Sequence, residues 1–174
     1  MTQSEIIQEL KTSHSIFIDY INSLSEAEFE NAKPEKWTAG QQLVHMVKSV
    51  SPLVKAFKMP NLVLKSLFGT SKEGSRTFQE VVDKYLAVIE AGAEAPKDFI
   101  PPEHIPFDQK QKLTEKLEEK VNQCCKLVEK YSEADLDKYR LPHPVLGKLT
   151  IREMLYFTIY HVQHHRRTVE RDIA

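Results

Sequence analysis

Three histidines carry the clearest chemical signal in this chain of 174 residues: His45, His161 and His165. His161 and His165 are four residues apart, so on a helix both imidazoles lie on one face and can bind one divalent metal ion. A third imidazole from another element would complete a three-nitrogen site. Three protein ligands leave a coordination position open for water or substrate, which is typical of catalytic metal centres.

A helical wheel supports the two late histidines more strongly than the early one. His161 and His165 lie about 40° apart, in an apolar sector, so both are predicted to point into the protein. His45 lies opposite the apolar seam of its predicted helix, which by itself predicts a surface histidine. Its own face carries small residues that could line a recess, namely Ser49, Pro52 and Ala56. The alternative for the late pair is two partly buried histidines that bond to backbone or water.

Helical periodicity dominates the chain and predicts an all-α fold in a single domain, residues 1–174. There are only five glycines and no convincing alternating strand pattern. Apolar residues recur at helical spacing in four long segments, which predicts a four-helix bundle. The expected helices cover residues 3–24, 39–57, 108–131 and 151–171.

The second and fourth of these helices have clear start signals. Thr38 with Gln41, and Thr150 with Glu153, have the spacing of capping boxes.

A long connection, residues 58–106, follows the second helix. It has too many residues for a plain bundle loop, and is expected to hold an extra helix over about 77 to 91 before a proline-rich segment. Such connections often form a pocket wall, so we expect this one to enclose a metal recess off the central seam.

Composition narrows the class of protein. Lys plus Arg (24) nearly balances Asp plus Glu (25), so no basic excess points to nucleic acid as a partner. No stretch has the length and apolarity of a membrane span or a secretory signal, which predicts a cytoplasmic protein. Cys124 and Cys125, adjacent in a predicted helix, are expected to be free thiols, with Cys124 buried.

The remaining candidate residues have weaker patterns. His164 could stand behind the metal ligands or line a pocket, although an interfacial histidine is favoured. His14 could reach the core, and is expected to be a core or boundary histidine whose hydrogen bonds are satisfied. His104 and His143 lie in proline-rich loops and are assigned no chemistry. A group of basic residues could bind an anionic substrate tail, but a solvated helix face is favoured: Lys148, Arg152, Arg166, Arg167 and Arg171. The loop 141–149 is expected to lead into the last helix, and no catalytic residue is identified.

The order of these motifs resembles a known family. A Trp37-Thr38 helix start precedes His45, residues 143–153 follow far downstream, and residues 161–165 have the pattern HxxHH. The chain is therefore similar to the DinB-like superfamily of metal-binding four-helix bundles. The residues after His165, Arg166 to Val169, depart from a common version of the motif.

This resemblance implies a divalent metal ion, zinc or nickel, bound by His45, His161 and His165, often in a homodimer. Related proteins include transferases that use low-molecular-weight thiols and metal-dependent hydrolases. The leading hypothesis is accordingly a divalent-metal-dependent enzyme that acts on a small molecule with metal-bound water or thiol. The alternatives are a non-catalytic, stress-associated metal-binding dimer and a helical interaction module without metal.

Overall fold

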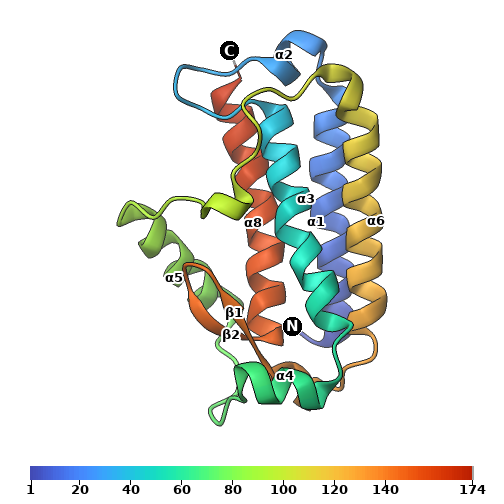
Figure 1. Cartoon of the computed structure of the whole chain (residues 1–174), viewed down its shortest axis with the longest axis vertical. Helices are drawn as coiled ribbons and strands as arrows, with labels where there is room; N and C mark the ends of the chain where they lie inside the picture. Colours follow the sequence, from blue (N-terminus) through green and yellow to red (C-terminus); the bar gives the residue numbers. More distant parts are fainter. Residues whose placement is uncertain (174) are drawn as a thin grey trace.

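The computed structural model describes residues 1–173, which form a bundle of four long helices (Figure 1). These are α1 (Gln3–Ser23), α3 (Ala39–Phe57), α6 (Lys110–Val128) and α8 (Ile151–Asp172). They agree closely with the four predicted segments because each presents an apolar stripe to a shared core. No helix among the described residues is both long enough and apolar enough to cross a membrane.

The direction of the helices explains the long connection. In Figure 1, α1 and α8 run upward whereas α3 and α6 run downward, so the chain must return from the lower to the upper end between α3 and α6. A helix of about 19 residues is close to 28 Å long, which a short loop cannot span. The connection climbs the outside of the bundle and contains α5 (Phe78–Glu90), which packs on α8. The expected extra helix is thus confirmed.

Capping boxes set the starts of the helices. Thr38 with Gln41 and Thr150 with Glu153 form the predicted reciprocal hydrogen bonds, and Thr77 with Glu80 does the same at α5. Each box satisfies backbone N–H groups that have no partner within the helix. Helix α8 therefore begins at a defined residue, which places its histidines at a defined height in the bundle.

The expectation of an all-α fold was correct for the bundle but wrong for residues 141–149, which were expected to form a loop. Strands β1 (Arg140–His143) and β2 (Gly147–Thr150) form an antiparallel hairpin that leads directly into α8. The paired residues Leu141 and Leu149 are both buried against the bundle. Strands of four residues, one of them containing a proline, are too short for the alternating pattern to stand out in the sequence.

Several short helices were also not predicted. They are α2 (Glu26–Glu30), α4 (Asn61–Phe68) and α7 (Glu133–Lys138), together with the 3-10 turns Lys97–Phe99 and Phe107–Gln109. Each has too few residues to show helical periodicity. The turn Lys97–Phe99 matters most for the site, because it lies against α3.

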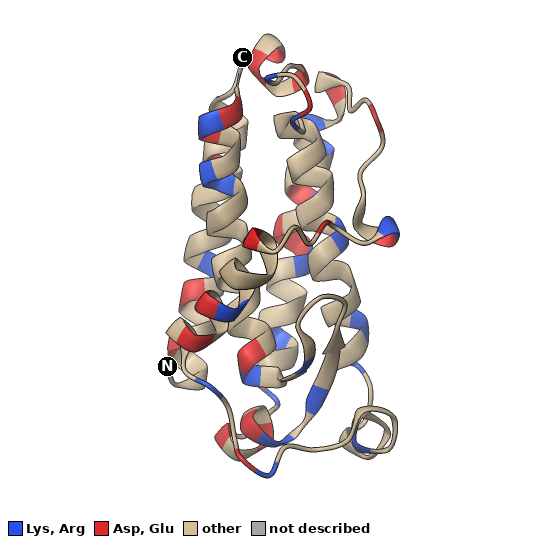
Figure 2. Cartoon of the chain, turned by 90° about the vertical axis from the view of Figure 1, so that its left-hand side faces the viewer, with Lys and Arg blue, Asp and Glu red and all other residues tan. Residues whose placement is uncertain are grey.

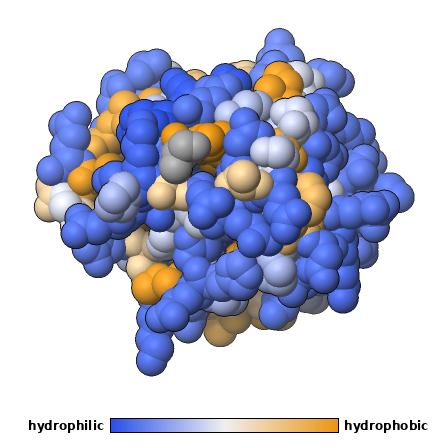
Figure 3. All heavy atoms as spheres, turned by 90° about the horizontal axis from the view of Figure 1, so that it is seen from above, coloured by the Kyte–Doolittle hydropathy of each residue, from blue (hydrophilic) through white to orange (hydrophobic). Residues whose placement is uncertain are grey.

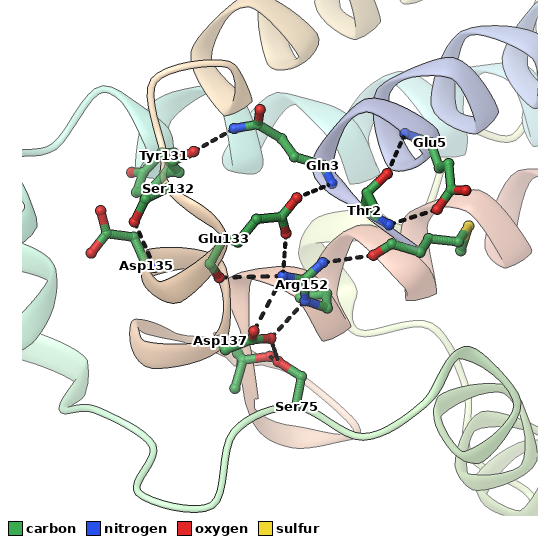
Figure 4. A network of polar contacts seen from close by, with 12 residues as sticks. Thr2, Gln3, Glu5, Ser75, Tyr131, Ser132, Glu133, Asp135, Asp137 and Arg152 are labelled. Carbon is green, nitrogen blue, oxygen red and sulfur yellow. Dashed lines mark hydrogen bonds and ion pairs between the residues drawn. The ribbon is translucent and has the colours of Figure 1, made fainter.

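Arg152 corrects the prediction of a solvated basic face. Its side chain is buried, and its guanidinium donates to the carboxylates of Glu133 and Asp137 and to the carbonyl oxygen of Met1 (Figure 4). The network ties the start of the chain and α7 to the first turn of α8. Arg166 and Arg171 instead pair with the neighbouring carboxylates of Glu170 and Asp172.

Candidate metal centre and pocket

The three predicted histidines come together between α3 and α8. The Nε2 atom of His161 lies 2.9 Å from Nε2 of His165 and 3.4 Å from Nε2 of His45. Each residue is less than a tenth exposed. Within residues 1–173, these three form the group whose ligand atoms lie close enough together to share a metal ion.

Hydrogen bonds at the far side of two rings decide which nitrogen faces the centre. His45 Nδ1 lies 2.9 Å from the carbonyl oxygen of Phe99, and His165 Nδ1 lies 2.5 Å from Oε1 of Gln42. These oxygens accept hydrogen bonds, so both Nδ1 atoms carry the proton and both Nε2 atoms carry a lone pair. The lone pairs of His45 and His165 therefore point toward Nε2 of His161.

Electrostatics favour the neutral form of all three rings. Burial lowers the pKa of His45, and burial followed by the neighbouring imidazoles lowers the pKa of His161 and His165 well below the ordinary value. A single proton on His161 could satisfy only one of the two facing lone pairs. A divalent ion would instead bind the Nε2 lone pairs of all three rings. Nitrogen ligands of a tetrahedral zinc ion lie about 3.3 Å apart, close to the spacing of the Nε2 atoms here. The donor set thus fits a metal ion.

His45 is buried, contrary to the prediction from its helical wheel. Its ring lies 5.2 Å from that of Trp37, centroid to centroid, and the turn Lys97–Phe99 packs against the same helix. A wheel describes one helix alone, so it cannot include a segment that is distant in sequence and covers the polar face. The connection between α3 and α6 supplies that cover.

A pocket of about 260 Å³ adjoins the three histidines. Ser49 and Pro52 line it as predicted, but Ala56 does not. Part of its wall comes from the connection, as expected, including Tyr85 on α5 and residues 93–96. The hairpin turn, with Pro142 to Val145, forms another part of the wall that was not predicted. The recess was expected off the central seam of the bundle. The pocket extends further inward than that, since buried core residues such as His14 and Val50 also line it.

Comparison with known families agrees with this architecture. The family model of the DinB superfamily matches residues 9–169. This range contains α3, α6, most of α1 and α8, and all three histidines. The chain belongs to the DinB superfamily. Among curated proteins, no match is found.

In this DinB domain, three further histidines line the same pocket: His14, His143 and His164. His143 was assigned no chemistry, yet its Nδ1 accepts the backbone N–H groups of Val145 and Leu146, and burial lowers its pKa to about 4. His14 is buried as predicted, but the prediction that its ring would be satisfied was wrong, because its Nε2 has no hydrogen-bond partner among the described residues. His164 has the predicted alternative place in the pocket wall, with its ring 5.7 Å from that of Tyr85. His104 is exposed and is not among the residues that line the pocket.

Two residues of the DinB site were missed from the sequence. Gln42 lies three residues before His45 and so shares its helix face, a signal that could have identified it. Tyr85 lies on α5, with its ring 5.9 Å from that of His161, and burial raises its pKa, so its hydroxyl stays protonated. No pattern in the sequence connects Tyr85 with α8.

The cysteines take no part in the pocket of this DinB domain. Cys124 and Cys125 are both free thiols on α6, as expected. Cys124 is buried as predicted, and Cys125 is buried as well, which was not predicted. Burial raises the pKa of both, to about 11 for Cys125, so neither is an available thiolate near neutral pH. Any thiol chemistry in the pocket would use a thiol from a bound small molecule.

Proposed function

We propose that this DinB protein is a divalent-metal-dependent enzyme of the hydrolase or thiol-transferase type, with His45, His161 and His165 as metal ligands. The observation that carries the proposal is the convergence of three neutral imidazoles at the wall of a pocket. A divalent ion held by these residues would act as a Lewis acid and would lower the pKa of a bound water or thiol. Zinc and nickel both suit imidazole ligands.

The protein's own groups contribute orientation and exclusion of water. Gln42 and the Phe99 carbonyl hold the rings of His165 and His45 in place by accepting their Nδ1 protons. The hydroxyl of Tyr85 remains protonated, so it can donate a hydrogen bond to a substrate oxygen. The lining is mainly apolar, which favours a small molecule with a hydrophobic body, such as an electrophile that accepts a low-molecular-weight thiol.

One observation favours a second candidate, a non-catalytic metal-binding protein. Among the described residues that line the pocket, Glu94 is the sole carboxylate, and it is exposed. A hydrolytic reaction often uses a nearby carboxylate as general base. In this alternative, a stress-associated dimer, the ion would stabilise the fold by linking α3 to α8.

Metal content and turnover test the proposal together. Purified protein is stripped, reconstituted with Zn²⁺ or Ni²⁺, and compared with His45→Ala and with His104→Ala, an exposed histidine that serves as control. We expect one tightly bound ion in wild type and in His104→Ala, and affinity more than about 100-fold weaker in His45→Ala, since loss of a ligand should exceed the effect of losing a supporting residue. Equal affinity in His45→Ala would exclude the site.

Substrate panels then separate the candidate functions. Metal-dependent hydrolysis of esters or amides supports a hydrolase, and metal-dependent conjugation of a small thiol to electrophiles supports a transferase. If the loaded protein turns over neither while metal removal lowers Tm, the non-catalytic alternative holds. If wild type binds less than one ion and His161→Ala changes only local packing, both metal proposals fail.

A further inference from the structure

His14 has a buried ring nitrogen with no hydrogen-bond partner. The residue lies on α1, is 2 % exposed and lines the pocket beside the three histidines. Its Nδ1 lies 2.8 Å from the carbonyl oxygen of Leu10, whereas its Nε2 contacts no donor among residues 1–173. Because a carbonyl oxygen only accepts, Nδ1 carries the proton and Nε2 carries the lone pair.

The chemical state of this nitrogen is well defined. Burial lowers the pKa of His14 to about 4, so the ring is neutral at physiological pH and Nε2 is an acceptor. The hydroxyl of Ser13, the preceding residue, donates to the Glu9 carbonyl. The two hydroxyl-bearing serine and threonine residues of the pocket lining, Ser49 and Thr158, donate to the carbonyls of His45 and Met154, so neither supplies a donor to His14. A buried acceptor without a donor destabilises the folded protein, so a ligand that supplies the donor is favoured.

The surroundings of His14 indicate what kind of group would approach it. The lining of the pocket that His14 shares is largely apolar, with Met46, Val50 and Met154 among its residues, and no Lys or Arg occurs among the described lining residues. A carboxylate would meet a lone pair there without a compensating cation, so an anionic group is disfavoured. A neutral hydroxyl or amide N–H supplies the missing donor.

We propose that His14 is a substrate-positioning residue, whose Nε2 accepts a hydrogen bond from a neutral donor on an apolar small molecule that reaches from α1 to the three histidines. The metal-binding end of this molecule rests on the proposed function. The contact with His14 depends only on the pocket. Substrates of this protein are therefore amphiphilic, with a hydroxyl or amide group separated from the reactive group by an apolar body.

Paired probes test the contact in the zinc-loaded protein. A series of ω-mercaptoalkanols of increasing chain length is titrated calorimetrically, each against the alkanethiol of equal length. At the chain length that reaches His14, we expect the mercaptoalkanol to bind about tenfold more tightly than the alkanethiol of equal length, because it gains one buried hydrogen bond. His14→Leu should abolish this preference, and His14→Gln, whose amide oxygen can replace Nε2, should restore part of it. Zinc content and Tm verify that each variant is folded and loaded.

A second measurement separates this inference from the metal proposal. In the metal-stripped chain labelled with ¹⁵N-histidine, the Nε2 resonance of His14 should move upfield when an alkanol is added, because an accepted hydrogen bond shields the nitrogen. A shift in protein that never binds zinc would retain the role of His14 and overturn the metal site alone. An unmoved resonance, or no hydroxyl preference at any chain length, would overturn the proposal, because Nε2 would then be satisfied by water or closed to ligands.

Discussion

Single hydrogen bonds decide the chemistry of the histidine cluster. Gln42 accepts from Nδ1 of His165, and the Phe99 carbonyl accepts from Nδ1 of His45, so Nε2 of each ring faces the centre. Without these acceptors, each ring could turn or carry its proton on the other nitrogen. In the proposed metal site, these acceptors behind the rings therefore orient the histidines that the helices bring together.

Replacement of Gln42 tests this dependence. Gln42→Leu removes the acceptor behind His165 while it preserves helix propensity, so zinc affinity should fall about 10- to 100-fold. Gln42→Glu keeps an acceptor and should stay near the wild-type value. Competition with a chelating dye measures both, with Gln8→Leu at an exposed position of α1 as control. Unchanged affinity in Gln42→Leu would show that packing alone orients His165.

At the scale of elements, the start of α3 is held between α2 and the connection. A Cβ atom at Gly40 would lie 2.8 Å from the ring of Phe29 and 2.9 Å from Cβ of Ile105, both of which are buried. Only a glycine permits this approach. The same turn of helix carries Gln42, and His45 follows one turn later, so the close contact positions the site.

Gly40→Ala should accordingly destabilise the protein, although alanine is the better helix former. We expect a loss of about 1 to 3 kcal/mol in the free energy of unfolding, because Phe29 and Ile105 must move apart. Chemical denaturation measures it. The control is Asn122→Ala, an exposed position of α6, which should be neutral or slightly stabilising. A stable Gly40→Ala protein would show that this region repacks easily.

Across the molecule, polar contacts hold the connection between α3 and α6 against the bundle near both of its ends. Near the lower end, Arg76 makes a two-pronged ion pair with Glu153 at the start of α8. Near the upper end, Gln41 donates to the carbonyl oxygens of Pro102 and Glu103.

The surface of the molecule is of mixed charge. Lys and Arg alternate with Asp and Glu on the face with α5 and the hairpin (Figure 2). The end that carries α2 is mostly hydrophilic (Figure 3).

The Arg76–Glu153 pair predicts how stability depends on pH. Burial raises the pKa of Glu153, but hydrogen bonds from the Arg76 side chain and from the Arg76 and Thr150 backbone lower it below the ordinary 4.5. Its contribution is therefore fully present above pH 4.5 and is lost as the pH falls through the lowered pKa.

Arg76→Met should lower the free energy of unfolding at pH 7 by about 2 kcal/mol or more and shift the acid loss to higher pH, because burial of Glu153 is then less compensated. Denaturation across an acid series measures both. Arg166→Met, which breaks an exposed pair on α8, should change stability by less than about 0.5 kcal/mol. An equal response in the two variants would contradict the structural role of Arg76.

Local sequence patterns were sufficient to predict the four long helices, the starts of two of them and the inward direction of two histidines. Apolar periodicity and capping boxes act over a few residues, so Ala39 and Ile151 could be predicted as helix starts, and His161 with His165 as a pair within one turn. The DinB resemblance added His45, which its own helix placed outside.

Three features could not be predicted in this way: the burial of His45, the orientation of the rings by Gln42 and the Phe99 carbonyl, and the presence of His14 and Tyr85 in one pocket. These contacts join segments far apart in the chain, and their geometry depends on how the connection crosses the bundle. Local patterns of apolar and polar residues carry no information about such pairings, because the free energy that selects them comes from packing of the whole molecule.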